Sequence, residues 1–472
     1  MPLRFCKSEV SPALSGLEPA TSGCDPRKTV PVVSETRYAS SGDVSIAYQE
    51  VGAGGPIDIV FVHGFVGNLE VEAENPRSEA FVKRLASLGR VIRFDRRGTG
   101  LSDRVREVPT LEARMDDLRA VMDDAQSSRA VVLATFEAAS MAMVYAATYP
   151  ERVAGLGVYN AVAKGIRSPD YPWAPFSEYE FERWLEQIRT RWGTRSLAAE
   201  DLRQVAPSIA DDPEMQEWWA RVMRLGASPG AAVVIARMSA AIDVRDILPS
   251  IRLPTLVLNS HLARGEAVYI AERIPNARRV DIGGPDSLFW LADGLADEII
   301  TFAPSVWGAP EPETVLATIL FTDIVGSTGK AAELGDRAWA DLLQRHHALV
   351  RAQLDRFRGR ELDTAGDGFF AAFDGPIRAI RCATAIEDIV RDLGLEVRAG
   401  LHTGECEVVG QKPTGIAVNV GARVASQAQA GEVLVSSTVK DLVAGSGLSF
   451  QDRGSHELRG IPGEWRLYAV DR

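Results

Sequence analysis

The sequence of 472 residues is poor in the features that mark secreted and membrane proteins. Its four cysteines include no CxxC pair and suggest no disulfide framework. No run of about 18 uninterrupted apolar residues occurs, because Glu137 breaks the longest candidate, so we expect no membrane span. The first residues also lack the apolar core of a signal peptide. Together these absences favour a cytoplasmic protein.

Positive charge is also scarce relative to negative charge. The formal net charge of −12 argues against nonspecific binding to nucleic acid or to anionic membranes. Hydrophobic residues make up 46% and charged residues 25%, which is ordinary for globular proteins, and the length predicts more than one domain. Residues 1–30 carry Pro, Ser, Gly and Thr without periodicity and are predicted to be a disordered tail. The sequence leaves open whether this tail belongs to the native protein.

From residue 31 to residue 302, short apolar segments alternate with amphipathic ones. This alternation is typical of an α/β domain whose mostly parallel sheet is covered by helices on both faces. The predicted strands are Ile57–Val62, Val91–Phe94, Ala130–Leu133, Gly155–Tyr159 and Thr255–Leu258. Residues 303–313 contain three prolines and are predicted to form a short, stiff linker.

Three motifs accompany these strands: His63-Gly64, the stretch 95–102 (DRRGTGLS) and the stretch 149–153 (YPERV). With them, residues 31–302 resemble an α/β-hydrolase domain, which implies a doubly wound sheet and a helical cap at about 162–240. In that fold the nucleophile occupies a sharp strand-to-helix turn, where this sequence has Phe136, and the base position holds Ser287. Ser140 is expected one turn into the helix, among packed neighbours. We therefore predict a catalytically inactive hydrolase-like domain.

The cap segment is rich in tryptophan. Two interpretations stay open: these rings pack the cap onto the sheet, or they line a site for an apolar small ligand. The tryptophans are Trp173, Trp184, Trp192, Trp218 and Trp219.

A second group of motifs begins at residue 314. Residues 314–323 form an apolar, β-prone run that ends at Asp323, whose carboxylate is suited to a metal ion. A helix is expected to start directly after it, where unpaired backbone N–H groups bind phosphate well. The residues expected to contribute these groups are Ile324, Val325, Gly326, Ser327 and Thr328.

Three later features add to this pattern. Residues 361–373 predict two strands joined by a Gly-Asp-Gly turn, with Asp367 at its tip. Asn419 and Arg423 lie four residues apart, so both project from one face of a helix. Arg459 precedes the closing strand, which is predicted over 465–470.

These ordered motifs give residues 314–472 a resemblance to the class III nucleotidyl cyclases. The resemblance implies an α+β, ferredoxin-like βαββαβ domain that forms a homodimer with active sites between the subunits. It implies that Asp323, with Ile324 beside it, and Asp367 bind two divalent cations, Mg²⁺ or Mn²⁺. Asn419 and Arg423 of the partner subunit would orient the ribose and stabilise the transition state, and Arg459 would clamp the triphosphate.

Such an enzyme would convert ATP to 3′,5′-cyclic AMP and pyrophosphate, with the hydrolase-like domain as a sensor or scaffold. The residues that read adenine in relatives are a Lys and an Asp; here the matching positions hold Asp363 and Lys412, so the donor and acceptor have exchanged places. Guanine presents the reversed pattern, which keeps GTP as an alternative substrate. A catalytically dead ligand-binding protein is the alternative from another functional class. The sensed signal, the direction of regulation and the physiological metal stay open.

Overall fold

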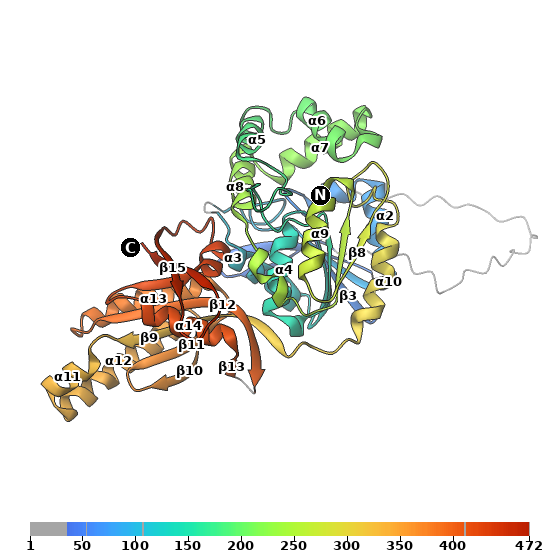
Figure 1. Ribbon diagram of the computed structural model, residues 1–472. Helices are drawn as coiled ribbons and strands as arrows, with labels where there is room; N and C mark the ends of the chain where they lie inside the picture. The colour runs from blue at the N-terminus through green and yellow to red at the C-terminus, as the bar shows by residue number, and fades with distance from the viewer. Residues whose placement is uncertain (1–34, 53, 106–107, 410–411, 472) are drawn as a thin grey trace, which may run out of the picture.

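The computed structural model describes residues 35–52, 54–105, 108–409 and 412–471, and the predicted tail at 1–30 lies outside them. Two sheets lie side by side, the first built from the N-terminal two thirds of the chain and the second from the C-terminal third (Figure 1). Within these described ranges, no helix is long and apolar enough to cross a membrane.

The first sheet has eight strands in the order β1-β2-β4-β3-β5-β6-β7-β8. Strand β2 is antiparallel to both its neighbours, and the strands from β4 to β8 are parallel. All five strands predicted here are confirmed, whereas β1, β2 and β8 were not predicted; β1 and β8 lie at the sheet edges and carry polar residues, which hides their apolar pattern. The strands are β1 (Arg37–Ser41), β2 (Val44–Val51), β3 (Ile57–Val62), β4 (Gly89–Phe94), β5 (Ala130–Thr135), β6 (Val153–Tyr159), β7 (Thr255–Asn259) and β8 (Ala277–Asp281).

Helices cover both faces of this sheet, as the doubly wound pattern predicts. One face packs against α2 (Pro76–Leu85) and α10 (Leu295–Trp307), and the other against α3 (Leu111–Asp124), α4 (Ala138–Thr148) and α9 (Arg264–Arg273). The short helix α1 (Leu69–Ala73) precedes α2.

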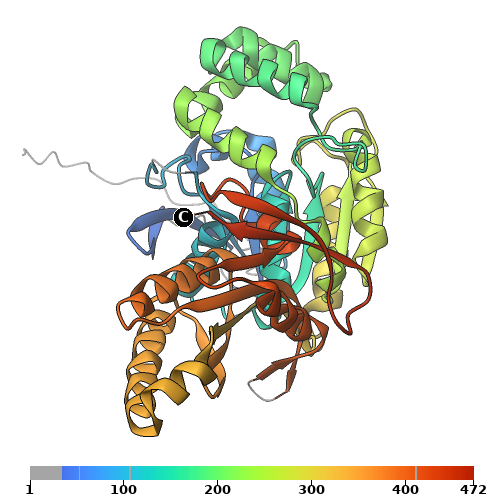
Figure 2. The same cartoon turned by 60° about the vertical axis from the view of Figure 1, so that its left-hand side comes forward.

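The cap lies above the sheet and consists of four helices, drawn in green in Figures 1 and 2. Each begins at a residue whose side chain accepts a backbone N–H of the first turn, and Ser177 forms a complete capping box with Glu180. The four helices are α5 (Glu178–Arg191), α6 (Arg195–Val205), α7 (Pro213–Gly226) and α8 (Pro229–Ala241).

The linker is shorter than predicted. Helix α10 continues to Trp307, so the prediction that the linker starts at 303 is wrong. The reason is packing, because Ala303 and Val306 are buried against the sheet and Pro304 does not end the helix. Only residues 308–313 connect the two domains.

The second sheet runs in the order β10-β11-β9-β12-β14-β16-β15, with β13 paired to β12. Its first half is the predicted ferredoxin-like βαββαβ unit, which is confirmed. The strands are β9 (Thr314–Ile324), β10 (Arg360–Ala365), β11 (Gly368–Phe373), β12 (Val397–Val409), β13 (Lys412–Thr414), β14 (Val433–Ser436), β15 (Phe450–Glu457) and β16 (Glu464–Val470).

Side chains of β9 alternate between two apolar layers, as a strand buried on both faces requires. Leu320 and Ile324 pack towards α12 and α13, whereas Ala317 and Ile319 pack on the face that α14 covers. The helices of this domain are α11 (Ser327–Leu334), α12 (Asp336–Arg356), α13 (Pro376–Arg391), α14 (Ile416–Gln427) and α15 (Ser437–Leu442).

The two domains meet through the start of β9 and the start of α13. Leu316 of β9 is buried in the same apolar cluster as residues of α3 and α4. Glu112 of α3 accepts the backbone N–H of Ile377 at 3.0 Å, so it caps α13 from the other domain. Arg378 lies between the domains, 3.1 Å from Glu112, 2.7 Å from Asp374 and in contact with Asp116. Helix α13 is thereby fixed to α3.

We expect Arg378→Met to weaken this interface, because it leaves the buried Glu112 carboxylate beside two further acids without its cation. Breaking a buried ion pair costs about 3 kcal/mol or more. Denaturant unfolding and the rate of proteolytic cleavage within 308–313 measure the effect. Arg381→Met changes an exposed arginine of the same helix and serves as the control. Equal stability and equal cleavage rates for the two variants would contradict the anchoring role of Arg378.

Candidate active site

Asp323 stands near the end of β9, opposite Arg398 of β12. The Arg398 guanidinium donates to Asp323 Oδ2 from Nη2 at 2.6 Å and from Nε at 3.1 Å. Asp323 is 38% exposed, so it is accessible from solvent. Both contacts are made to Oδ2, and Oδ1 lies on the side of the β10–β11 hairpin, where a methyl group on Gly368 would be 3.9 Å from it.

Asp367 lies at the tip of that hairpin, as predicted. The turn is Gly366-Asp367, and Gly366 has φ +65°, a conformation that favours glycine. Phe369 pairs with Thr322, and continuing this register places the turn beside the end of β9 that carries Asp323. The structure therefore brings Asp323 and the Asp367 turn together at one end of the strands β9 and β11.

The chemistry of these two carboxylates fits a hard cation. Asp367 Oδ2 is buried and has no hydrogen-bond partner among the described residues. A buried anionic oxygen without a donor is costly, and a divalent cation would satisfy it. The part of the chain described by the structure contains no cluster of three or more His, Cys, Asp or Glu that could hold a metal. Further ligands would thus have to come from the backbone, as predicted for Ile324, and from phosphate and water, which is usual for Mg²⁺.

The predicted phosphate cradle is only partly supported. Helix α11 begins at Ser327, so the N–H groups of its first turn, including Thr328, have no acceptor inside the helix. Gly326 caps it with φ +68°. The prediction is wrong for Val325, because its N–H already donates to the Glu396 carbonyl at 2.8 Å.

Asn419 and Arg423 are both exposed on α14, while Val420 and Val424 of the same helix are buried against the sheet. The predicted shared face is confirmed. Arg423 Nε donates to the carbonyl oxygen of Arg459 at 3.1 Å, so the chain brings these two arginines together. No hydrogen bond or ion pair among the described residues joins either α14 side chain to Asp323 or Asp367.

Of the two residues expected to read the base, Asp363 is exposed on β10, and its Oδ1 accepts the N–H of Thr364 at 2.9 Å. Lys412 begins β13 and pairs with Val409 of β12 through the backbone. Its side chain lies outside what the structure describes.

The hydrolase-like domain retains the strained strand-to-helix turn of its fold, but no nucleophilic side chain occupies that turn. Phe136 has φ +52°, and its N–H donates to the Tyr159 carbonyl at 3.0 Å, so a phenyl ring occupies the nucleophile elbow. Ser287 is buried, and its Oγ lies 2.8 Å from Ser260 Oγ. Ser140 is buried in α4 and bonds the Val162 carbonyl. No triad geometry is formed by these positions.

Sequence reasoning missed the role of Glu137. Its carboxylate accepts the N–H of Phe65 at 2.8 Å and is held by Arg96 Nη1 at 2.6 Å. Burial alone would raise the pKa of Glu137, but Arg96 and Arg114 outweigh it and hold that pKa below its usual value. In the hydrolase fold, a backbone N–H from the loop after strand β3 helps to bind the oxyanion. Here Phe65 lies in the loop after β3, and its N–H already donates to the Glu137 carboxylate. The signal was a charged residue directly after Phe136 in an otherwise apolar run.

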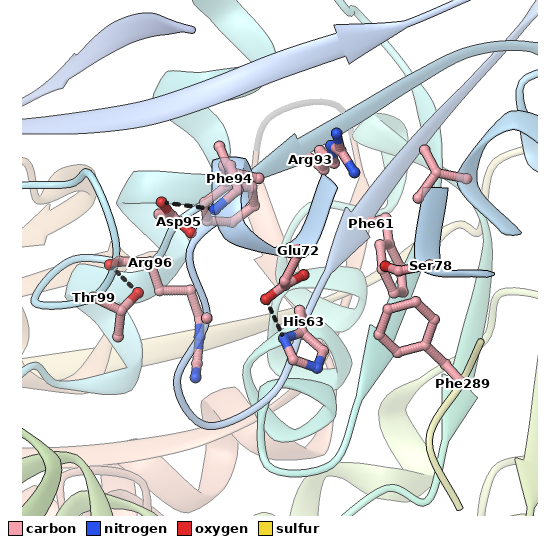
Figure 3. Close-up of a pocket in the computed structure, with 13 residues that line it drawn as sticks. Phe61, His63, Glu72, Ser78, Arg93, Phe94, Asp95, Arg96, Thr99 and Phe289 are labelled. Atoms are coloured by element: carbon pink, nitrogen blue, oxygen red, sulfur yellow. Dashed lines mark hydrogen bonds and ion pairs between the residues drawn. The ribbon is translucent and has the colours of Figure 1, made fainter. Parts of the chain in front are cut away.

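A polar cluster lies next to this turn (Figure 3). His63 Nδ1 is 3.2 Å from Glu72 Oε1, and the figure shows the rings of Phe61 and Phe289 beside His63. Burial raises the pKa of Asp95 in the same cluster to about 7. The enclosed space is about 20 Å³, which is room for a water molecule and not for an organic substrate.

A larger cavity of about 350 Å³ lies between the cap and the sheet. Its wall is mostly apolar and includes Phe65, Phe136, Trp184, Trp192 and Trp219. Helix α8 contributes Ala236, Ser239 and Ala240 to it. Trp173 and Trp218 are not among the residues that line this cavity.

Comparisons with known proteins separate the same two regions. Residues 310–472 match the family described as "Adenylate and Guanylate cyclase catalytic domain", and residues 58–262 match "Serine aminopeptidase, S33". The chain is 27% identical over 214 residues to "Receptor-type adenylate cyclase GRESAG 4.3" of Trypanosoma brucei brucei, which covers 34% of this chain and 17% of that protein. It is 29% identical over 156 residues to "Putative adenylate cyclase 3" of Rhizobium meliloti (strain 1021), covering 31% of this chain and 26% of that protein. The chain thus spans only a small part of these relatives.

Among solved structures, the bromoperoxidase from Bacillus anthracis aligns with a TM-score of 0.50 at 21% identity. The alignment covers 57% of this chain and 99% of the bromoperoxidase, and it shows the fold alone. The chain therefore joins an α/β-hydrolase-like domain to a class III cyclase catalytic domain.

Proposed function

We propose that the protein is a nucleotidyl cyclase that converts ATP to 3′,5′-cyclic AMP and pyrophosphate as a homodimer. The observation that carries this proposal is a pair of acids, Asp323 near the end of β9 and Asp367 in the β10–β11 turn beside it: Asp323 is accessible, and Asp367 Oδ2 is buried without a donor. The match to the cyclase catalytic family supports it.

Each residue of the candidate site would have its own role in the reaction. Asp323 and Asp367, with the backbone of Ile324, would hold two divalent cations. When bound, such ions neutralise phosphate charge and activate the attacking 3′-hydroxyl. Arg398 stays on Asp323 Oδ2 and orients that carboxylate towards the hairpin.

The nucleotide-binding site would be completed by residues of the other subunit. Asn419 of the partner subunit orients the ribose, and Arg423 of the partner subunit stabilises charge on the phosphoryl oxygens through a guanidinium that does not lose its proton. Arg459 of the partner subunit, whose carbonyl accepts from Arg423 of that same subunit, clamps the triphosphate. The exposure of Asn419 and Arg423 in the single chain supports this arrangement, because neither is covered by the hydrolase-like domain.

We expect Asp323→Asn and Asp367→Asn each to lower cyclase kcat by roughly 100-fold or more, since both carboxylates share the ions. Asp367→Asn should retain or increase stability, because it removes a buried charge without a donor. Activity and thermal unfolding are measured together, with Asp341→Asn as an exposed control in the same domain. Near-normal kcat in a folded Asp323→Asn protein would refute the metal assignment.

Shared sites predict complementation. Asp323→Ala and Arg423→Ala homodimers should both be inactive, whereas co-expressed chains should recover about one quarter of wild-type activity, since half of the dimers are mixed and each mixed dimer holds one intact site. The heterodimer fraction is determined with two affinity tags. No recovery in a sample that contains heterodimers would rule out sites built from two subunits.

GTP is the second candidate substrate, favoured by the exchanged positions of Asp363 and Lys412. Asp363 would accept from guanine N1–H and Lys412 would donate to O6. We expect the exchange Asp363→Lys with Lys412→Asp to shift the ratio of kcat/KM for ATP and GTP by about 5-fold to 150-fold, because a mismatched hydrogen bond costs roughly 1 to 3 kcal/mol. Steady-state kinetics of the wild type, both single variants and the exchange decide this. An unchanged ratio means that these residues do not read the base.

The hydrolase-like domain is proposed to be a sensor that binds an apolar small ligand in the cap cavity. Helix α8 lines that cavity, and a methyl group on Gly445 of the cyclase domain would lie 3.6 Å from Ala241 Cβ at its end. The next segment, the 3₁₀ helix η3 (Arg245–Ser250), bonds α15 through Asp246 and Thr438 at 3.1 Å. A ligand that displaces α8 would thus act on the cyclase domain. An unchanged cyclisation rate with the cavity filled would contradict this coupling.

A further inference from the structure

We infer that the cap cavity takes an apolar molecule that carries a hydrogen-bond donor, a hydroxyl or a protonated amine, and rejects carboxylates. This inference rests on the proposed sensor role of the hydrolase-like domain. It concerns the chemistry that selects the ligand.

The size and the wall of the cavity favour an apolar body. About 350 Å³ is within the range of small-molecule sites. Phe176 and Trp184 stack with ring centroids 4.9 Å apart, and Phe65 lies 5.0 Å from Trp184. Trp192 donates its indole N–H to the carbonyls of Met223 and Ala227, which fixes the ring in place. The aromatic wall is therefore a preformed apolar surface.

The charges that face the cavity have one sign. Three acids line it, Glu137, Glu200 and Asp201, and no Lys or Arg is among its described lining residues. Glu137 is paired with Arg96, and Glu200 is paired with Arg191 at 2.8 and 2.6 Å. His63 also lines the cavity, but it is already paired with Glu72 at 3.2 Å. A ligand carboxylate would therefore find no Lys or Arg in the wall and would face like charges.

Asp201 is the acid available for recognition, beside the uncharged polar residues Gln187, Gln204 and Ser239 of the same wall. Trp219 Nε1 donates to its Oδ2 at 2.7 Å, and no ion pair of the described residues includes Asp201. Burial raises the pKa of Asp201, with the Trp219 contact opposing it. A hydroxyl would donate to this carboxyl group, and an ammonium would pair with its charged form while its apolar body contacts the aromatic rings.

The former oxyanion position cannot receive a ligand anion either. In this domain the Phe65 N–H is occupied by the Glu137 carboxylate at 2.8 Å. A ligand carboxylate or ester carbonyl would have to displace a buried, ion-paired group to reach that donor. The contact that occupies this oxyanion donor thus also disfavours acids in the cavity.

The test compares three ten-carbon probes, decylamine, 1-decanol and decanoic acid, binding to the full chain at pH 7.5. Calorimetry and tryptophan fluorescence report binding. We expect the amine and the alcohol to bind and the acid to bind at least ten-fold more weakly. Asp201→Asn should weaken the amine about ten-fold, whereas Asp211→Asn, an exposed cap residue, should leave it unchanged. Ser239→Phe, which narrows the cavity, should weaken binding of the alcohol.

The possible outcomes distinguish a failure of the proposed ligand class from a failure of the proposed sensor role. Decanoic acid binding as tightly as decylamine would overturn the charge selection and leave the ligand site standing. Equal effects of Asp201→Asn and Asp211→Asn would overturn the assignment of Asp201. Absence of binding by all three probes would overturn both the inference and the proposed sensor. A bound probe that leaves the cyclisation rate unchanged would count against the sensor role alone.

Discussion

Strand β9 links the two domains, because it packs against the hydrolase-like domain at one end and carries Asp323 near the other. Its first residues are buried against the hydrolase-like domain through Leu316, and its last residues carry Asp323. Seven residues of extended strand separate these points by about 24 Å. The antiparallel ladder with β12 holds β9 over its whole length, so its Leu316 end and its Asp323 end cannot move independently. In both views α11, which follows Asp323, lies at the end of the cyclase domain away from the first sheet (Figures 1 and 2).

The interface joins the hydrolase-like domain, whose nucleophile position holds Phe136, to the cyclase domain through charged contacts. Glu112 caps α13, and Arg378 lies among three acids drawn from both domains. Buried ion pairs contribute little net stability but penalise other arrangements, because each unpaired charge is costly. The contact therefore specifies one orientation of the two domains. It also places α3 and the end of the cap helix α8 directly against the cyclase domain. These two helices also contact each other.

Much of this could be predicted from the sequence where the pattern is local. The β9 run, the Asp367 hairpin and the α14 pair follow from periodicity and turn chemistry. The contacts that escaped prediction are long-range: Arg398 on Asp323 depends on the register of β12, and Glu137 on Phe65 depends on two loops that meet only in the fold. The occupied Val325 N–H and the extension of α10 past Pro304 have the same cause, since tertiary packing decided both. The metal ions remain a prediction from the resemblance, supported by the orphaned Asp367 oxygen, and the dimer remains a prediction from the resemblance alone.

We propose that Asp323 and Asp367, beside one end of β9, support cyclisation while the hydrolase-like domain packs against the other end of that strand. The most direct measurement incubates the purified full chain with ATP or GTP and Mn²⁺ or Mg²⁺, and identifies the products by mass spectrometry. We expect a 3′,5′-cyclic nucleotide and pyrophosphate that appear only with the metal. Bound nucleotide and metal without any cyclic product from ATP or GTP, at concentrations where the protein is dimeric, would contradict it.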